Sequence, residues 1–264
     1  MRLLAVHAHP DDETLFTGAL LATVALLGEV RLVTCTRGER GEVIGAGLAH
    51  LEGDGPALAA HREGELAAAL EALGVREHLF LDALLDRRVE DSGMRWVADG
   101  VAGPAEDVGE RAFVRAPLEP LAAALAAELD RWRPDVVVTY GPDGGYGHPD
   151  HVRAHELTMR AVALAAVEPL VLWAVAAPRR EQVCAAGGPR LEVPLGPVVE
   201  ALAAAMRAHE TQVQDVVVGP GTVDFALSNG VPQRLGPVEV HEPGGPVRPF
   251  TWPALLGAQE WPVT

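Results

Sequence analysis

The sequence predicts an α/β fold: a Rossmann-like, mostly parallel sheet with helices on both faces, followed by a C-terminal extension that contains short β segments. Short apolar runs rich in β-branched residues alternate along the chain with longer stretches of helical periodicity, which is the pattern of βαβ units. No internal repeat or low-complexity linker interrupts this alternation. We therefore expect a single domain over residues 1–264, with an α/β core at 1–180 and the extension at 181–264.

The strands of the core are predicted from short apolar runs that end at polar residues, proline or glycine. The first run stops at two histidines, the second (EVRLVTCT) is strongly β-branched, and "PDVVVTY" is bounded by Pro134 and Gly141. After Pro178 the pattern weakens, and only short β-like pieces follow. The predicted strands of the core lie at residues 2–8, 29–36, 78–82, 134–140 and 170–177.

Helices are predicted between these strands from longer stretches of apolar residues at helical spacing. Gly28 and Gly74 follow two of these stretches directly, as glycine does where it caps the C-terminus of a helix. Residues 83–117 are charged and glycine-rich, and they are predicted to form a long irregular loop of the lid-like kind. The predicted helices lie at residues 12–27, 57–73, 118–132, 149–167 and about 197–209.

Composition excludes some classes of partner. The formal net charge of −16 argues against a nucleic-acid partner, because phosphate binding needs a basic surface, and argues weakly against docking on anionic lipid. Two cysteines, Cys35 and Cys184, are too few for a disulfide framework. The first apolar run is too short for a signal peptide or a membrane span. We expect a cytoplasmic protein without a nucleic-acid or membrane partner; the sequence leaves its oligomeric state open.

The two stretches richest in ionisable residues follow the first and fourth predicted strands. They are "HAHPDDE" and "GPDGGYGHPDH". In the common doubly wound order these two strands are neighbours at the switch point, where ligands bind beyond the carboxyl ends of the strands. The two stretches are therefore predicted to meet. A dinucleotide cofactor does not fit there, because bulky side chains and carboxylates replace the glycines of a G-x-G-x-x-G turn.

A metal ion accounts for the crowding of charge in these two loops. Adjacent carboxylates such as Asp11 and Asp12 repel each other unless a positive charge lies near them. A catalytic zinc site uses about three His, Asp or Glu ligands and leaves a position open for water. His9 and Asp12 are three residues apart at a predicted helix start, and a third ligand is available from His148 or His151. A non-functional alternative is that Asp11 and Asp12 only cap the helix that follows.

These residues also carry a family resemblance. His9-Pro10-Asp11-Asp12-Glu13 together with His148-Pro149-Asp150-His151 resembles the LmbE/PIG-L family of zinc-dependent N-acetylglucosamine de-N-acetylases, over roughly the first two-thirds of the chain. The stretches "TCTRGERGEVIG", "HREGELAAALEALGV", "DSGM" and "VVVTYGPDGGYGHPDHV" are similar to the branch of this family that acts on N-acetylglucosaminyl-inositol in mycothiol biosynthesis.

The resemblance implies a zinc-dependent hydrolase that removes acetyl from a glucosamine-containing small molecule, with one zinc ion held by His9, Asp12 and His151. Asp11 is implied as the general base beside the metal's water. Ferrous iron is an alternative metal, since His/His/Asp sites accept either ion. The resemblance also implies that His148 is the cation or general acid that helps the amine leave, and that Asp150 orients it. Tyr146 is implied as a hydrogen-bond donor to the oxyanion.

Substrate-binding roles are implied for Arg62, Asp91 and Glu42, which match positions that hold sugar or inositol hydroxyls in the family. Simpler interpretations stand beside two of them. Arg62 lies on a glutamate-rich predicted helix and could pair on the surface with Glu63 or Glu65. Asp91, followed by Ser-Gly, could be an ordinary turn residue.

Three alternative functions remain open from the sequence. Two belong to the same chemistry: an amidase of mycothiol S-conjugates, and a deacetylase of a secondary-metabolite sugar. The third is a non-catalytic metal- or sugar-binding module on the same fold. Asp11 argues against this module, because a site that only binds metal has no use for a base beside its ligands.

Overall fold

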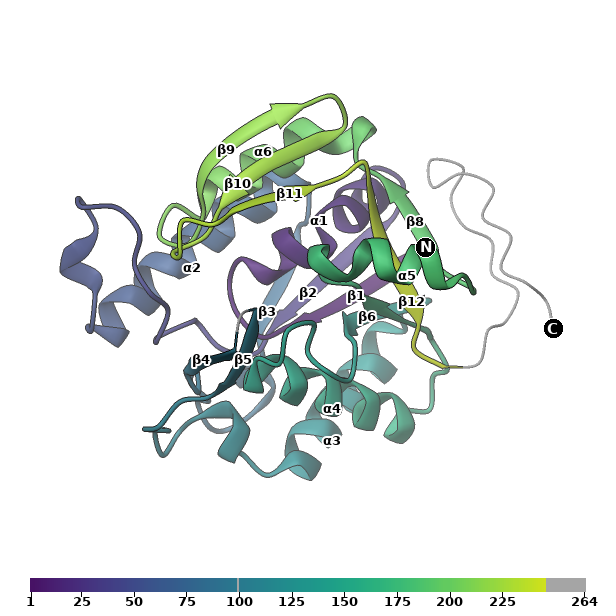
Figure 1. The fold of residues 1–264 in the computed structure, drawn as a ribbon. Coiled ribbons are helices and arrows are strands. Elements are labelled where there is room, and N and C mark those ends of the chain that lie inside the picture. The colour runs from purple at the N-terminus through teal and green to yellow at the C-terminus, as the bar shows by residue number, and fades with distance from the viewer. Residues whose placement is uncertain (99, 246–264) are drawn as a thin grey trace.

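A seven-stranded sheet forms the centre of the protein in the computed structural model, which describes residues 1–98 and 100–245. The strand order is β3-β2-β1-β6-β7-β12-β8 (Figure 1). Every strand predicted for the core is present, and these strands are parallel to one another, so the predicted fold class is confirmed. They are β1 (Arg2–His7), β2 (Glu29–Thr34), β3 (Glu77–Phe80), β6 (Val136–Tyr140) and β7 (Leu170–Ala174).

The C-terminal extension completes one edge of this sheet. β12 (Val238–Pro243) pairs antiparallel with β7, and β8 (Leu191–Pro194) pairs antiparallel with β12. The sequence predicted short β segments here but did not indicate that they join the main sheet. Residues 246–264 of the predicted extension lie outside the described part of the chain.

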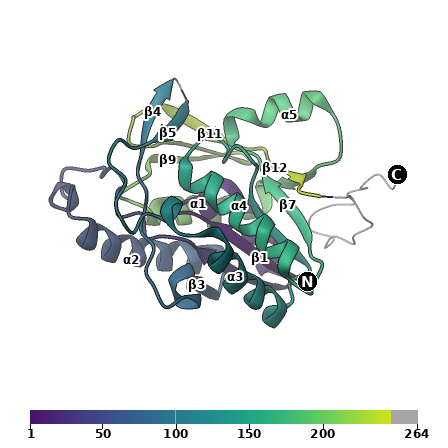
Figure 2. The same cartoon turned by 90° about the horizontal axis from the view of Figure 1, so that it is seen from below.

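Helices cover both faces of the sheet. One face carries α1, α2 and α6, which pack against one another, and the other carries α3 and α4 (Figures 1 and 2). A short helix, α5, was not predicted. The bounds are α1 (Asp12–Ala25), α2 (Gly55–Leu73), α3 (Leu118–Trp132), α4 (Pro149–Leu164), α5 (Arg180–Ala186) and α6 (Val199–Ala208).

The region predicted as one irregular loop, residues 83–117, contains a β-hairpin. β4 (Met94–Ala98) pairs antiparallel with β5 (Val101–Pro104). The prediction of an irregular loop is therefore wrong for these residues. The strands are short, β4 is mostly exposed and β5 buries only its two middle residues, so neither has the apolar alternation of a half-buried strand. A second antiparallel sheet packs against α6 and is built from β9 (Gln214–Gly219), β10 (Thr222–Ala226) and β11 (Pro232–Leu235).

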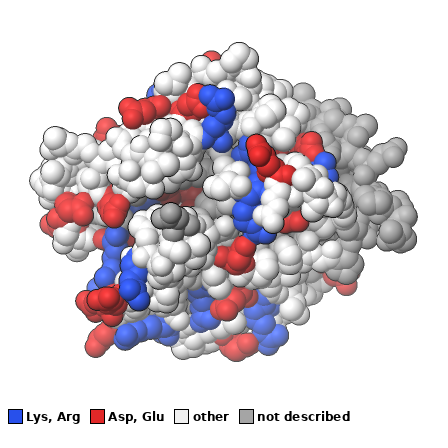
Figure 3. Space-filling model, viewed as in Figure 1, with Lys and Arg blue, Asp and Glu red and all other residues white. Residues whose placement is uncertain are grey.

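The central strands are buried because helices cover both of their faces. All residues of β6 are buried, and so are all residues of β1 except Arg2. Across the described residues no helix is both long and apolar enough to cross a membrane. On the surface, acidic and basic side chains are interspersed over the face shown in Figure 3.

A histidine on β3 should make the stability of the fold depend on pH. Burial lowers the pKa of His78 to about 4, and its Nε2 lies 3.1 Å from Thr34 Oγ1. Between pH 6.5 and pH 4 the unfolded chain therefore binds a proton that the folded protein does not, and the free energy of unfolding falls as the pH falls.

We expect His78→Gln, which keeps a donor for Thr34, to remove about 2 kcal/mol of this acid destabilisation, after allowing for the partial exposure of the ring. The measurement is urea unfolding of wild type and variant at several pH values, with chelator present so that metal release adds no pH dependence. Equal slopes in the two proteins would show that His78 does not carry the effect.

Candidate active site

The two ionisable loops meet at the carboxyl ends of β1 and β6. These strands are hydrogen-bonded neighbours, with Leu3, Leu4 and Ala5 opposite Val136, Val137 and Val138. The loop after β1 leads into α1, and the loop after β6 leads into α4. The predicted convergence at the switch point is therefore confirmed.

Asp12 lies between two histidines that come from the two loops. Its Oδ2 is 3.3 Å from His9 Nδ1, and its Oδ1 is 3.2 Å from His151 Nε2. All three side chains are buried. Ligand atoms on a tetrahedral zinc ion, at about 2.0–2.1 Å from it, are about 3.3–3.4 Å apart. Each of these two separations is therefore that of neighbouring ligands on one ion, and the two contacts use different oxygens of Asp12.

The hydrogen bonds of His151 leave one ring nitrogen for a metal. Nδ1 lies 3.0 Å from Gly144 O, and a carbonyl oxygen can only accept, so Nδ1 carries the proton and the neutral ring has a lone pair on Nε2. That Nε2 is buried, has no hydrogen-bond partner among the described residues and faces the Asp12 carboxylate. A lone pair facing a carboxylate is repelled unless a cation lies between them. A histidine that donates to a backbone carbonyl through its other nitrogen is typical of metal sites.

His9 is arranged in the same way. Its Nε2 is 3.2 Å from Asp150 Oδ2 and 3.7 Å from Asp91 Oδ1, so a proton on Nε2 leaves Nδ1 free toward Asp12. Burial alone would lower the pKa of His9, but Asp91, Asp12 and Asp150 raise it well above its ordinary value. These carboxylates favour a positive charge at this place, whether a proton or a metal ion.

Other groups of potential ligands overlap with this one. In one group, His9, His148 and His151 each offer a ring nitrogen, and these three atoms lie within 4.8 Å of one another. In the other group, one ligand atom each of His9, Asp91 and Asp150 meets the same limit. The Asp91–Asp150 group is already engaged, because Asp91 Oδ1 accepts from Gly93 N at 2.7 Å and Asp150 Oδ2 accepts from Ser92 N at 2.9 Å.

Asp11 occupies the position directly before α1 but does not cap the helix with its side chain. Its side chain makes no capping hydrogen bond, so the capping alternative is wrong for this residue. Its backbone has a φ of 115°, which is unusual for a residue with a side chain. The carboxylate keeps limited access to solvent and lies 3.4 Å from Arg62 Nη2. Burial raises the pKa of Asp11 to about 7; Arg62 opposes this shift and Asp12 adds to it.

Arg62 is 2% exposed, and the surface ion pair with Glu63 or Glu65 is absent from its contacts among the described residues. Its guanidinium donates to Gly38 O at 3.0 Å and to Pro10 O. A Cβ on Gly38, which has a φ of 68°, would lie 2.0 Å from Arg62 Nη1, so the glycine is required for this approach. Arg62 thus holds the loop that carries Asp11, and its predicted contact with substrate stays a prediction.

His148 caps α4, and its Nδ1 accepts from the backbone N–H of Asp150 at 3.1 Å. The orienting contact is therefore with the Asp150 backbone. Burial, together with His151 and His9, lowers the pKa of His148 well below its ordinary value. A ring whose Nδ1 accepts a hydrogen bond carries its proton on Nε2, so of the two predicted forms the structure favours the neutral donor over the cation.

The ring of Tyr146 packs beside those of His148 and His151. Its ring centroid is 5.1 Å from that of His151 and 5.9 Å from that of Trp96, which lies on the hairpin and stacks on it. Burial, with smaller contributions from Asp12 and Asp11, raises the pKa of Tyr146 well above its ordinary value, so the hydroxyl remains a donor at neutral pH.

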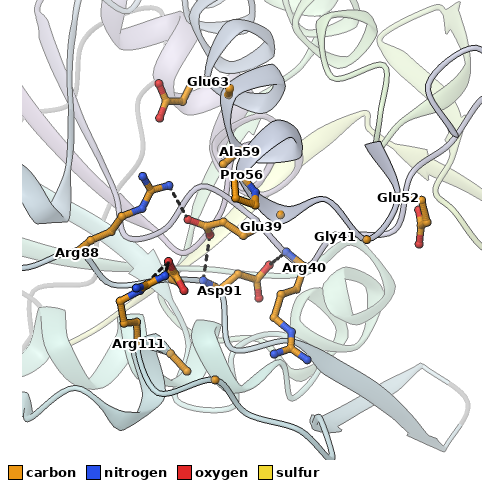
Figure 4. A pocket seen from close by; sticks show the side chains of 16 residues that line it. Glu39, Arg40, Gly41, Glu52, Pro56, Ala59, Glu63, Arg88, Asp91 and Arg111 are labelled. Atoms are coloured by element: carbon orange, nitrogen blue, oxygen red, sulfur yellow. Dashed lines mark hydrogen bonds and ion pairs between the residues drawn. The ribbon is translucent and has the colours of Figure 1, made fainter. Parts of the chain in front are cut away.

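A cleft of about 820 Å³ adjoins these residues through Asp91, which lines it (Figure 4) and whose Oδ1 lies 3.7 Å from His9 Nε2. The contacts of Asp91 fit both of its predicted roles. It accepts from Gly93 N, as a turn residue does, and it also lies near His9, as a residue of the site would. Glu42 is exposed and does not line the cleft; its backbone carbonyl accepts from Gln212.

Several residues that line this cleft are not among the individual site residues predicted from the sequence. Glu39 accepts from Asp91 N at 3.1 Å and from Arg88 at 3.0 Å, and Figure 4 shows it between these two residues. Arg40 and Arg111 line the same cleft. In the sequence these residues resemble a solvated charged loop, and only the pairing of distant segments brings them together.

Comparisons with known proteins agree with this geometry. The family model described as GlcNAc-PI de-N-acetylase matches residues 4–162. A 1D-myo-inositol 2-acetamido-2-deoxy-alpha-D-glucopyranoside deacetylase of Kineococcus radiotolerans is 45% identical, over 90% of this chain and 76% of the relative. A protein of the same name from a Nocardioides species is 41% identical, over 87% of each chain.

Solved structures share the fold. The N,N'-diacetylchitobiose deacetylase of Pyrococcus horikoshii aligns with a TM-score of 0.54 at 20% identity, over 78% of this chain and 70% of that one. The family match covers more than half of the sequence, and the relatives cover most of it. This chain belongs to the GlcNAc-PI de-N-acetylase (PIG-L/LmbE) family.

Proposed function

We propose that this protein is a metal-dependent amide hydrolase that removes the N-acetyl group from N-acetylglucosaminyl-inositol. The observation that carries the proposal is the buried contact of Asp12 with both His9 and His151, in which His151 Nε2 has no hydrogen-bond partner. The relatives named as deacetylases of this substrate support the substrate class. The substrate partner is a small amino sugar.

The ligands that we propose are His9 Nδ1, one oxygen or both of Asp12, and His151 Nε2. Each histidine uses its other nitrogen to bond a fixed acceptor, Asp150 for His9 and Gly144 O for His151, which holds the free lone pair of each ring toward the Asp12 carboxylate. Two histidines and a carboxylate suit zinc, and also ferrous iron. Metal analysis of the purified protein decides between these two ions.

A divalent ion at this point would acidify a water molecule and polarise the amide carbonyl of the substrate. Asp11 accepts the proton of the attacking water, since its carboxylate adjoins the proposed ligand Asp12 and is reached from solvent. Tyr146 donates a hydrogen bond to the carbonyl oxygen as negative charge develops there. His148 donates its Nε2 proton to the nitrogen as the C–N bond breaks, so that acetate and a free amine leave.

The cleft beside Asp91 provides a site for the rest of the substrate. It offers arginine and carboxylate side chains, Glu39, Arg40, Arg88 and Arg111, of the kind that bind a polyol through several hydrogen bonds. Its volume of about 820 Å³ is within the range of small-molecule sites. Inositol, which carries several hydroxyls and no charge, fits this lining.

An amine-release assay with the zinc-loaded protein tests the proposed function. We expect kcat/KM on N-acetylglucosaminyl-inositol to exceed that on free N-acetylglucosamine by at least about 100-fold, because the latter cannot fill the polyol cleft. A mycothiol S-conjugate is the third substrate. Preference for the conjugate would assign the amidase function instead, and failure to release amine from any of them would reject amide hydrolysis of this class.

A further inference from the structure

A buried pair of side chains, Glu13 and His209, lies directly behind Asp11. Glu13 Oε2 accepts from the backbone N–H of Asp11 at 2.9 Å, and Glu13 Oε1 accepts from His209 Nε2 at 2.7 Å. Both side chains are fully buried. His209 ends α6 and lies 196 residues away from Glu13 along the chain, so a distant segment reaches the start of α1.

The backbone of Asp11 needs such support. A non-glycine residue with a φ of 115° stores on the order of 1–3 kcal/mol of strain and keeps this conformation only where its surroundings hold it. The Glu13 carboxylate is the partner of the Asp11 N–H. The bond fixes the peptide at the point where the chain turns from Pro10 into α1, and so fixes the direction in which the Asp11 side chain leaves the backbone.

Glu13 in turn depends on His209. A carboxylate without exposure is costly to bury unless several donors satisfy it. The donors to Glu13 are the Asp11 N–H, the Thr14 hydroxyl and His209 Nε2. Without the histidine, one oxygen would keep only the Thr14 hydroxyl of its adjacent residue, and the carboxyl would tend to take up a proton or move.

The turn that carries His209 also contacts α2 and the loop before it. Thr211 donates to both oxygens of Glu65 on α2 through its backbone N–H and hydroxyl, each at 2.7 Å. Gln212 donates to the carbonyl oxygen of Glu42 at 2.8 Å. This turn lies outside residues 4–162, which the family model matches. The C-terminal region is thus attached to the N-terminal half of the chain through three separate side chains, and among them His209 reaches the start of α1.

We infer that His209 is a positioning residue for Asp11: through Glu13 it holds the strained backbone that directs the Asp11 carboxylate toward the reacting water. The C-terminal extension therefore completes the base of the reaction although it supplies no metal ligand. This inference rests on the proposed function, because it takes Asp11 to be the general base.

The chain provides a matched control in a second buried histidine–glutamate pair, which lies on β12 and binds the same helix, α1. His241 Nε2 lies 2.8 Å from Glu239 Oε1, and both residues are buried. Glu239 accepts from the backbone N–H groups of Ala19 and Leu20, further along α1 and away from Asp11. Loss of His241 should therefore cost stability as loss of His209 does, without affecting the base.

The experiment compares His209→Leu and His241→Leu with wild type in the zinc-loaded protein, by steady-state amine release from N-acetylglucosaminyl-inositol, zinc content and thermal unfolding. We expect His209→Leu to lower kcat by roughly tenfold or more, since small misplacements of a catalytic group have effects of this size. KM and zinc content should stay within about twofold of wild type, because substrate contacts and ligands are unchanged. His241→Leu should lower the melting temperature similarly and leave kcat within about twofold.

A second pair of variants covers the case in which His209→Leu does not fold. The amide of His209→Gln reaches Glu13 and should restore most of kcat, whereas the shorter His209→Asn should not. Equal kcat in these two variants, or an equal loss of kcat in His209→Leu and His241→Leu, would overturn the inference and leave the proposed function standing. Absence of amine release by the wild-type protein would overturn both.

Discussion

Asp11→Asn is expected to reduce the rate of amine release by about 1,000-fold while the bound metal stays at the wild-type level. A general base contributes about 10²- to 10⁴-fold to such a reaction, and an amide cannot accept the proton of the water. The variant should fold normally. Asparagine tolerates a positive φ as well as aspartate does, and its backbone N–H still donates to Glu13.

The measurement combines steady-state kinetics with metal analysis of the same preparation. Activity near that of wild type would remove Asp11 from the mechanism, and loss of metal would show that Asp11 is a ligand. The variant also separates an enzyme from a module that only binds metal or sugar. In such a module Asp11→Asn would leave the affinity for both metal and sugar unchanged, and no amine would be released by wild type.

His151→Ala is expected to lose both the metal and all measurable amine release. The proposed ligand atom, Nε2, is buried and otherwise unpaired, so no other described side chain replaces it at that position. His155→Ala is the matched control: it lies one turn further along α4, and its Nδ1 bonds Tyr140 O at 2.9 Å, just as His151 Nδ1 bonds Gly144 O at 3.0 Å. The control should keep metal and activity.

Metal content after His148→Ala and Asp12→Ala decides between the two overlapping ligand groups. The Asp12-centred set predicts that Asp12→Ala loses the metal, whereas His148→Ala keeps it and loses rate. The three-histidine set predicts that His148→Ala loses the metal and that Asp12→Ala keeps it. A stoichiometric amount of metal in His151→Ala would contradict both sets, because His151 belongs to each.

Local patterns in the sequence predicted the two loops of the site that follow β1 and β6. Strand-ending histidines and helix starts are visible as residue patterns, and the rule that ligands bind at the switch point then places "HPDDE" beside "HPDH". The meeting of the two ionisable loops therefore follows from the sequence alone, and β1 and β6 are neighbours as expected.

Features that depend on pairing between distant segments could not be predicted in the same way. β8 and β12 lie where the apolar pattern is weak, and nothing in their sequences indicates that they add antiparallel strands to the edge at β7. Arg62 lies among glutamates on α2, a pattern typical of a solvated face, yet it is buried beneath Pro10 and Gly38. His209 shows no local sign of its bond to Glu13.

The individual contacts of Asp150 and His148 could not be predicted from the sequence either. The motif indicates that both residues belong to the site, but the division of contacts depends on how the side chains are turned. The Asp150 carboxylate bonds His9 and Ser92, while its backbone N–H bonds His148. Only three-dimensional geometry supplies this division, and with it the proton on His148 Nε2.

Titration of the metal-free protein with Zn²⁺, with amine release measured at each step, tests the central claim most directly. The claim is that one divalent ion held by His9, Asp12 and His151 is required for the hydrolysis. We expect metal-free protein to be inactive and activity to rise linearly until about one equivalent per chain is bound, as a site with three protein ligands for one zinc ion requires. Full activity of the metal-free protein, or activity that does not follow bound zinc, would contradict it.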